Sequence, residues 1–294
     1  MKKTVFKGVG TALITPFRDG KIDYGALSLL IDRQIYAGID ALIVGGTTGE
    51  AATLDDAERY ELYNFTRDYT KGRCKLIFGT GTNDTKKAIR HTEMAEKIGC
   101  DGALAVTPYY NKGTREGIAL HYEAISDAVT LPIILYNVPS RTGVSLDIDT
   151  VERLAERENI VAIKEASDSQ DRLAALSCIS GMGLYAGNDS ALFTVLSLGG
   201  LGVISVVSNL YPRETIEICK QYFANNTNEA LKMQKRLLPV INSLFLETNP
   251  APIKYALSQL GLCTGQMRLP MWLVTEGTKR RIESAIKEFE GQTG

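Results

Sequence analysis

An eightfold alternation of short apolar runs with longer amphipathic segments constrains this chain more than any other feature. The apolar runs are residues 8–16, 41–46, 75–81, 102–108, 132–139, 160–166, 183–189 and 202–208. The segments between them place apolar residues at helical spacing, as in 24–38, 55–70 and 114–129. Strands that alternate with helices in this way are typical of an α/β fold with a parallel sheet.

The runs are apolar at nearly every position, which is expected of strands that are buried on both faces. Eight such units in 294 residues favour closure into a (β/α)8 TIM barrel, a fold that commonly uses about 250 residues. An open doubly wound sheet is the alternative, but it usually has fewer strands, and no GxGxxG motif follows residues 8–16. We therefore predict one closed barrel.

The chain beyond about residue 211 contains further helical patterns and no strand pattern, including residues 249–262 and 272–290. No low-complexity linker separates this part from the barrel, so we expect it to pack on the barrel. The sequence predicts a catalytic barrel over residues 1–224 and a C-terminal helical region over residues 225–294.

Composition excludes several classes of protein. The formal net charge of −1 offers no field that would attract nucleic acid or an acidic membrane. No stretch approaches the roughly 20 apolar residues of a membrane-spanning helix. The N-terminal apolar run is broken by glycines and by Lys7 before a signal-peptide core develops. We expect a cytoplasmic protein without nucleic-acid or membrane partners.

The cysteines and histidines give no sign of a disulfide framework or a metal centre. The five cysteines form no CxxC pair, and we predict reduced thiols in the core. His91 and His121 lie in helix-like segments without carboxylates at ligand spacing, so no metal site is predicted.

Candidate site residues follow four of the predicted strands. In (β/α)8 barrels the functional residues lie at the carboxyl ends of the strands and in the loops that follow. Polar stretches occupy this place at residues 45–51, 107–112, 136–143 and 164–167. We expect all four to share one rim of the barrel.

Lys164 raises a specific question, because it ends an apolar strand. It lies 28 residues after Tyr136, about one βα unit, so the two should stand at similar heights on strands about 4.8 Å apart. Alternation along the strand would direct Ala162 and Lys164 into the lumen and leave Val161 and Ile163 to pack beneath the helices.

A lysine buried in the lumen suits covalent chemistry. Burial disfavours the charged ammonium, and an unprotonated amine attacks a carbonyl to form a Schiff base. The alternatives are that Lys164 pairs with Glu165 or reaches to the rim, and that Tyr136 is a core aromatic with a satisfied hydroxyl.

Three further stretches suggest substrate contacts. Thr47 and Thr48 could hold a carboxylate through hydroxyl and amide donors, although the same residues suit a turn and a helix cap. Arg141 could clamp a substrate carboxylate or be a solvated surface charge. Tyr109 and Tyr110 are unusual exposed aromatics, which indicates a subunit interface or a site lining.

Taken together, these stretches resemble the dihydrodipicolinate synthase family of class I pyruvate-dependent aldolases and lyases. The matching motifs are GTTGEAATL, VTPYYNK, YNVPSRTG, IKEAS, GVISVVSN and NPAPIKYAL, and the resemblance runs from about residue 4 to residue 290. It implies that Lys164 forms a Schiff base with pyruvate, and that the enamine adds to L-aspartate 4-semialdehyde. The product would be 4-hydroxy-tetrahydrodipicolinate, on the diaminopimelate route to L-lysine, and no cofactor is implied.

The resemblance also implies roles for single residues. Tyr136, Thr47 and Tyr110 would relay protons, with Tyr110 inserted from the neighbouring subunit of a tight dimer. The family expectation is a homotetramer built from two such dimers. The residues implied to bind substrate are Thr47, Thr48, Arg141, Gly187 and the backbone carbonyl of Ile204.

An effector site is implied by the members of the family that L-lysine inhibits. The residues that match it are Asn83, Tyr109 and Ala52. The positions that differ are Asp56, Arg59 and Lys87, which are often histidine or glutamate in those members. Because a cationic Lys87 would repel a cationic effector, we predict weak or absent inhibition by L-lysine.

Two other functions must be weighed against this one. An N-acetylneuraminate lyase or a 2-keto-3-deoxy sugar acid aldolase keeps the lysine and tyrosine on the same barrel, but usually lacks the arginine of SRTG. Arg141 therefore favours the synthase. A binding protein that had lost catalysis would be expected to lack Lys164 or Tyr136.

Overall fold

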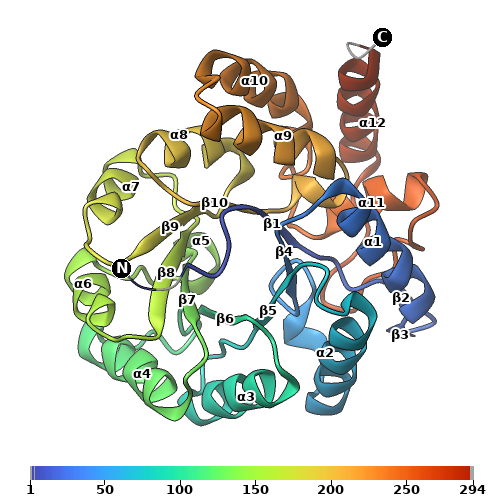
Figure 1. Cartoon of the computed structure of the whole chain (residues 1–294). Coiled ribbons are helices and arrows are strands. Elements are labelled where there is room, and N and C mark those ends of the chain that lie inside the picture. The colour runs from blue at the N-terminus through green and yellow to red at the C-terminus, as the bar shows by residue number, and fades with distance from the viewer. Residues whose placement is uncertain (1, 3, 292–294) are drawn as a thin grey trace.

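A computed structural model describes residue 2 and residues 4–291 of the chain. Eight parallel strands close into a barrel in the order β1-β10-β9-β8-β7-β6-β5-β4 (Figure 1). Their bounds are Gly8–Ala12 (β1), Ala41–Val44 (β4), Lys75–Gly79 (β5), Gly102–Val106 (β6), Ile133–Asn137 (β7), Ile160–Glu165 (β8), Gly183–Ala186 (β9) and Gly202–Ser205 (β10). All eight predicted strands and the (β/α)8 fold are confirmed, with each strand ending before the predicted limit where the chain turns into a rim loop.

The helices surround the barrel (Figure 1). They are Tyr24–Ala37 (α1), Asp56–Thr70 (α2), Thr85–Ile98 (α3), Arg115–Ala128 (α4), Pro139–Thr142 (α5), Ile148–Ala155 (α6), Gln170–Ser177 (α7), Leu192–Ser197 (α8), Pro212–Phe223 (α9), Thr227–Ser243 (α10), Ala251–Gln259 (α11) and Glu276–Gly291 (α12). Several begin at polar caps: the side chains of Asp23, Asp55 and Thr114 accept from backbone amides of the first turn. Such caps satisfy donors that the helix itself leaves free, so the local sequence fixes these helix starts.

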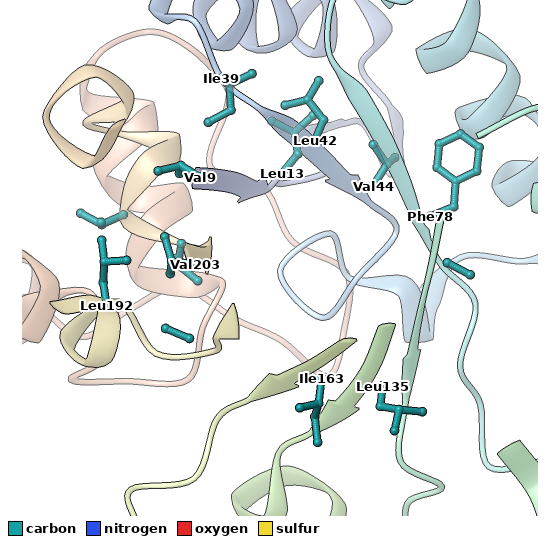
Figure 2. Packing of buried hydrophobic residues seen from close by; sticks show 14 of the residues in the cluster. Val9, Leu13, Ile39, Leu42, Val44, Phe78, Leu135, Ile163, Leu192 and Val203 are labelled. Atoms are coloured by element: carbon teal, nitrogen blue, oxygen red, sulfur yellow. The ribbon is translucent and has the colours of Figure 1, made fainter. Parts of the chain in front are cut away.

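The strands divide the core into two layers by simple alternation. Val9, Leu42, Leu135, Ile163 and Val203 face the surrounding helices in the larger layer (Figure 2). The alternate residues of the strands fill the lumen in a smaller cluster; among them are Ile43, Ile77, Ile134, Ala162 and Ile204. The lumen below the strand ends is therefore packed, and open space remains at their carboxyl ends.

One lumen residue departs from the predicted alternation. The pairing of β7 with β8 shifts register, because Ile133 pairs with Ile160 while Ile134 pairs with Ala162. Val161 is skipped by this shift and packs with the lumen cluster rather than beneath the helices. The placement of Ile163 is confirmed, and that of Val161 was wrong.

The C-terminal helices pack on the barrel. In Figure 1, α10 lies over α8 and α9, and α12 projects beyond the barrel wall. The side-chain amide of Gln234 on α10 donates to the buried carbonyl of Asp189 (3.1 Å). The predicted boundary at residues 224 and 225 falls between α9 and α10, and its status as a domain boundary stays a prediction.

A short hairpin, Phe17–Arg18 (β2) with Lys21–Ile22 (β3), was not predicted. No helix of the part that the structure describes is long and apolar enough to cross a membrane. All five cysteines are free: Cys219 is buried and three are partly buried, but Cys178 is exposed, so the prediction of core thiols was wrong for that residue.

Candidate active site

A cavity of about 450 Å3, which we call the mouth cavity, opens at the carboxyl ends of the strands. Six residues that the sequence predicted for the site line it: Thr47, Thr48, Tyr136, Arg141, Lys164 and Gly187. Its other wall includes residues 245–249, between α10 and α11. The barrel thus gathers residues from the carboxyl ends of four strands, β4, β7, β8 and β9, which is where functional residues lie on this fold.

Lys164 lies in the lumen against Tyr136. The two residues are direct cross-strand partners on β7 and β8, and the Lys164 nitrogen is 4.2 Å from the centre of the Tyr136 ring. Only 5% of Lys164 is exposed. Glu165 pairs with Arg172 instead (2.8 Å), and no ion pair joins Lys164 to a carboxylate of residues 4–291. The alternative of an ion pair between Lys164 and Glu165 is therefore wrong.

A buried polar network lies behind this pair and holds the two strand ends together. Asn137 and Glu165 are also cross-strand partners, and the Asn137 amide donates to both Glu165 oxygens (2.9 and 3.0 Å). Arg172 donates to the same carboxylate from α7. This network joins the ends of β7 and β8, on which Tyr136 and Lys164 lie.

Asp189 is a buried carboxylate that the sequence analysis missed. Its Oδ2 accepts from the amides of Val206 (3.0 Å) and Val207 (3.1 Å). Burial raises the pKa of Asp189, and the hydrogen bonds and the positive charge of Lys164 oppose that rise. The only sequence signal was an acidic residue at the end of the run 183–189.

Asn249 was also missed, although it connects two predicted site residues. Its side-chain amide donates to the hydroxyl of Thr48 (2.9 Å), and its carbonyl accepts from Arg141 (2.9 Å). This anchors the guanidinium of Arg141 at the wall of the mouth cavity. The motif NPAPIKYAL contains Asn249, but nothing local in the sequence indicates that it reaches the barrel mouth.

The comparison with known proteins agrees with this geometry. The model of the Dihydrodipicolinate synthetase family matches residues 5–289. The chain belongs to this family. A 4-hydroxy-tetrahydrodipicolinate synthase of Clostridium novyi (strain NT) is 46% identical over 288 residues, 97% of each chain. One of Endomicrobium trichonymphae is 42% identical over 287 residues, 97% of this chain and 99% of the relative.

Solved structures of the dihydrodipicolinate synthetase family share the fold over almost the whole chain. The dihydrodipicolinate synthase of Thermotoga maritima has a TM-score of 0.96 at 40% identity, covering 98% of this chain and 99% of that one. A dihydrodipicolinate synthase variant described as monomeric has a TM-score of 0.95 at 40% identity, covering 97% of both chains. Family membership alone therefore does not fix the number of subunits.

Two predicted residues, Tyr110 and Ile204, lie outside the lining of the mouth cavity within the single chain. Tyr110 is 87% exposed, in the loop between β6 and α4, and does not line the mouth cavity. Ile204 is buried in the lumen cluster, and Val206 lines the cavity instead. Gly187 does line it, and a Cβ there would lie 2.5 Å from that of Ala166, so a larger residue would disturb the wall.

The residues of this chain that were predicted for an effector site line a second cavity of about 390 Å3, which we call the lateral cavity. Its lining includes Ala52, Asn83, Tyr109, Arg59, Lys87 and His91. Tyr136 and Arg141 line both cavities. A ligand in the lateral cavity would therefore lie next to the mouth cavity.

Proposed function

We propose that the chain condenses pyruvate with L-aspartate 4-semialdehyde to 4-hydroxy-tetrahydrodipicolinate, in the diaminopimelate route to L-lysine. The observation that carries this proposal is the burial of Lys164 against Tyr136 without a carboxylate partner. The names of the similar relatives support the choice of substrates.

The first half of the proposed reaction forms the carbon nucleophile. The neutral amine of Lys164 attacks C2 of pyruvate, and the resulting carbinolamine loses water to give an imine. Loss of a proton from the pyruvate methyl group then converts the imine to an enamine. Each step moves one proton, and the hydroxyls of Tyr136 and Thr47 carry these protons.

The second half uses the enamine. Its carbon bonds to the aldehyde of the second substrate, and the new alkoxide takes up a proton. The substrate amine then attacks the imine carbon, closes the ring and releases Lys164 as the free amine. The complete cycle forms one molecule of water, needs no oxidant or reductant, and is proposed to use no cofactor.

The carboxylates of the two substrates have separate proposed sites. Thr47 and Thr48 hold that of pyruvate through hydroxyl and amide donors. Arg141, anchored on Asn249, holds that of the aldehyde by a charge-assisted contact. Gly187 and Val206 complete the lining.

Tyr110 joins the proton relay only if it comes from a neighbouring subunit. Its exposed position supports this arrangement, in which two tight dimers form a homotetramer. Mass measurement in solution tests the number of subunits. Turnover of Tyr110→Phe compared with the wild type tests the role of Tyr110 in the proton relay. A fully active monomer would contradict them.

Borohydride reduction in the presence of pyruvate tests the proposed chemistry directly. Reduction of the imine should leave a 1-carboxyethyl group on the peptide that contains Lys164, as detected by mass spectrometry. An unmodified peptide would overturn the Schiff-base mechanism. Comparing turnover of aspartate semialdehyde with cleavage of N-acetylneuraminate or a 2-keto-3-deoxy sugar acid separates the synthase from its sister enzymes.

A further inference from the structure

The lining of the mouth cavity combines two basic side chains with one acidic side chain. Lys164 and Arg141 are the basic residues. Within the part of the chain that the structure describes, Glu247 is the one acidic residue of this lining. It lies in the wall segment 245–249, two positions before Asn249, whose carbonyl accepts from Arg141 (2.9 Å). A cavity with both signs of charge on its walls suits a ligand that also carries both.

The carboxylate of Glu247 is held by neutral donors. Its Oε1 accepts from the backbone amide (2.9 Å) and the hydroxyl (2.7 Å) of Thr275. Hydrogen bonds from the hydroxyl of Thr278 and from Thr275 hold the pKa of Glu247 below its ordinary value. No lysine or arginine of residue 2 or residues 4–291 forms an ion pair with it. Glu247 is therefore an anion at neutral pH, and its charge is available to a cationic group of a ligand.

The proposed second substrate carries such a cationic group. L-aspartate 4-semialdehyde has a carboxylate and an ammonium on the same carbon, so an ammonium accompanies the carboxylate that Arg141 holds. Because Arg141 is anchored on the wall segment 245–249, the ammonium also lies toward that wall. We propose that Glu247 binds the ammonium and so selects an α-amino aldehyde over an aldehyde without the amine. This inference rests on the proposed function, in which Thr47, Thr48 and Arg141 bind only carboxylates.

Two other acidic residues must be weighed against Glu247. Asp168 and Asp189 line a neighbouring cavity of about 430 Å3 and do not line the mouth cavity. Asp189 is 3% exposed, and its Oδ2 already accepts from two backbone amides. Asp168 is exposed and accepts from the side-chain amide of Asn188 (3.3 Å). Glu247 is therefore better placed for the ammonium, and Asp168 provides a matched control.

Steady-state kinetics of the full chain with two aldehydes tests the proposal. Aspartate semialdehyde is the substrate, and succinic semialdehyde, which lacks only the amine, is the competing analogue. Glu247→Gln removes the negative charge but keeps an oxygen that can accept from Thr275. In this variant kcat/KM for aspartate semialdehyde should fall by about tenfold, the effect of one charge-assisted contact. The inhibition constant of succinic semialdehyde should not change, and Asp168→Asn should leave both values unchanged.

Three results would overturn the proposal. An unchanged kcat/KM in Glu247→Gln would show that the ammonium does not contact this residue. An equal loss for both aldehydes would show a disturbed wall instead of a lost contact with the amine. A tenfold loss in Asp168→Asn alone would place the ammonium in the neighbouring cavity. In each case turnover by the wild type and borohydride trapping of pyruvate would leave the proposed function intact, whereas a wild type without turnover would overturn both.

Discussion

Lys164 and Lys254 are both buried in this chain, but their surroundings differ. Each nitrogen lies over an aromatic ring, at 4.2 Å from the centre of Tyr136 and at 4.3 Å from that of Phe17. Lys254 also contacts the carboxylate of Glu50 and donates to a backbone carbonyl (2.9 Å). Among the residues that the structure describes, no carboxylate contacts Lys164, so the two lysines differ in having a counter-ion.

This difference separates a structural lysine from a reactive one. Burial lowers the pKa of Lys254, and the charge of Glu50 opposes that effect. A carboxylate in contact keeps an ammonium protonated, so its lone pair is not available for attack. Lys164 faces an aromatic ring and an open cavity instead, where a carbonyl carbon can reach it.

The largest expected effect is that of Lys164→Ala. Turnover should fall by at least about 10³-fold, because no other amine can replace the nucleophile. Circular dichroism and thermal unfolding should remain close to those of the wild type. If turnover of this variant stayed within tenfold of the wild type, Lys164 would not be the reactive lysine, and the proposed difference from Lys254 would be wrong.

Glu50→Gln should act on stability instead. It leaves the Lys254 ammonium buried and unpaired, which should lower the free energy of unfolding by about 3 kcal/mol in urea titrations. Glu276→Gln breaks an exposed ion pair with Lys279 and serves as the control, with little expected change. If both variants behaved alike, the pair at Lys254 would have no structural role.

Tyr136→Phe sharpens the comparison by removing only the hydroxyl from the ring next to Lys164. It removes the proton carrier but keeps the packing, so kcat should fall by about 10²-fold while the fold is retained. Tyr185→Phe is the control, because Tyr185 is another buried lumen tyrosine whose hydroxyl donates to the Phe6 carbonyl. Steady-state assays should show no comparable loss in that variant.

The smallest expected effect concerns L-lysine as an inhibitor. We predict weak or absent inhibition, because Lys87 in the lateral cavity repels a cationic effector. Initial rates over a lysine titration provide the measurement. Inhibition at low micromolar lysine would contradict this prediction.

Sequence periodicity was enough to predict the barrel and the contact between Tyr136 and Lys164. Burial on both faces makes the strands apolar, and the spacing of the βα repeat sets the height of each strand end. The barrel and the contact between Tyr136 and Lys164 can therefore be predicted from patterns within single βα units. The shift that moves Val161 into the lumen cluster depends on how β7 and β8 pair, which the sequence of either strand does not specify.

The residues that support the site were harder to predict because their partners are distant in sequence. The side chain of Asn249 donates a hydrogen bond to Thr48, which lies about 200 positions earlier in the sequence. Arg172 has the pattern of a surface helix residue, and only the fold shows that it reaches the Glu165 carboxylate. Tyr110 remains a prediction, since its proposed partner residues lie in another subunit.

The contacts of Asn249 have a consequence for attempts to shorten this protein. The wall of the mouth cavity and the anchor of Arg141 come from residues beyond the eighth βα unit. A chain truncated after residue 224 would keep every strand and Lys164, yet lose one side of its substrate pocket. The catalytic unit is therefore longer than the eight βα units alone. A redesign of substrate choice would have to include residues 245–249, which follow the barrel.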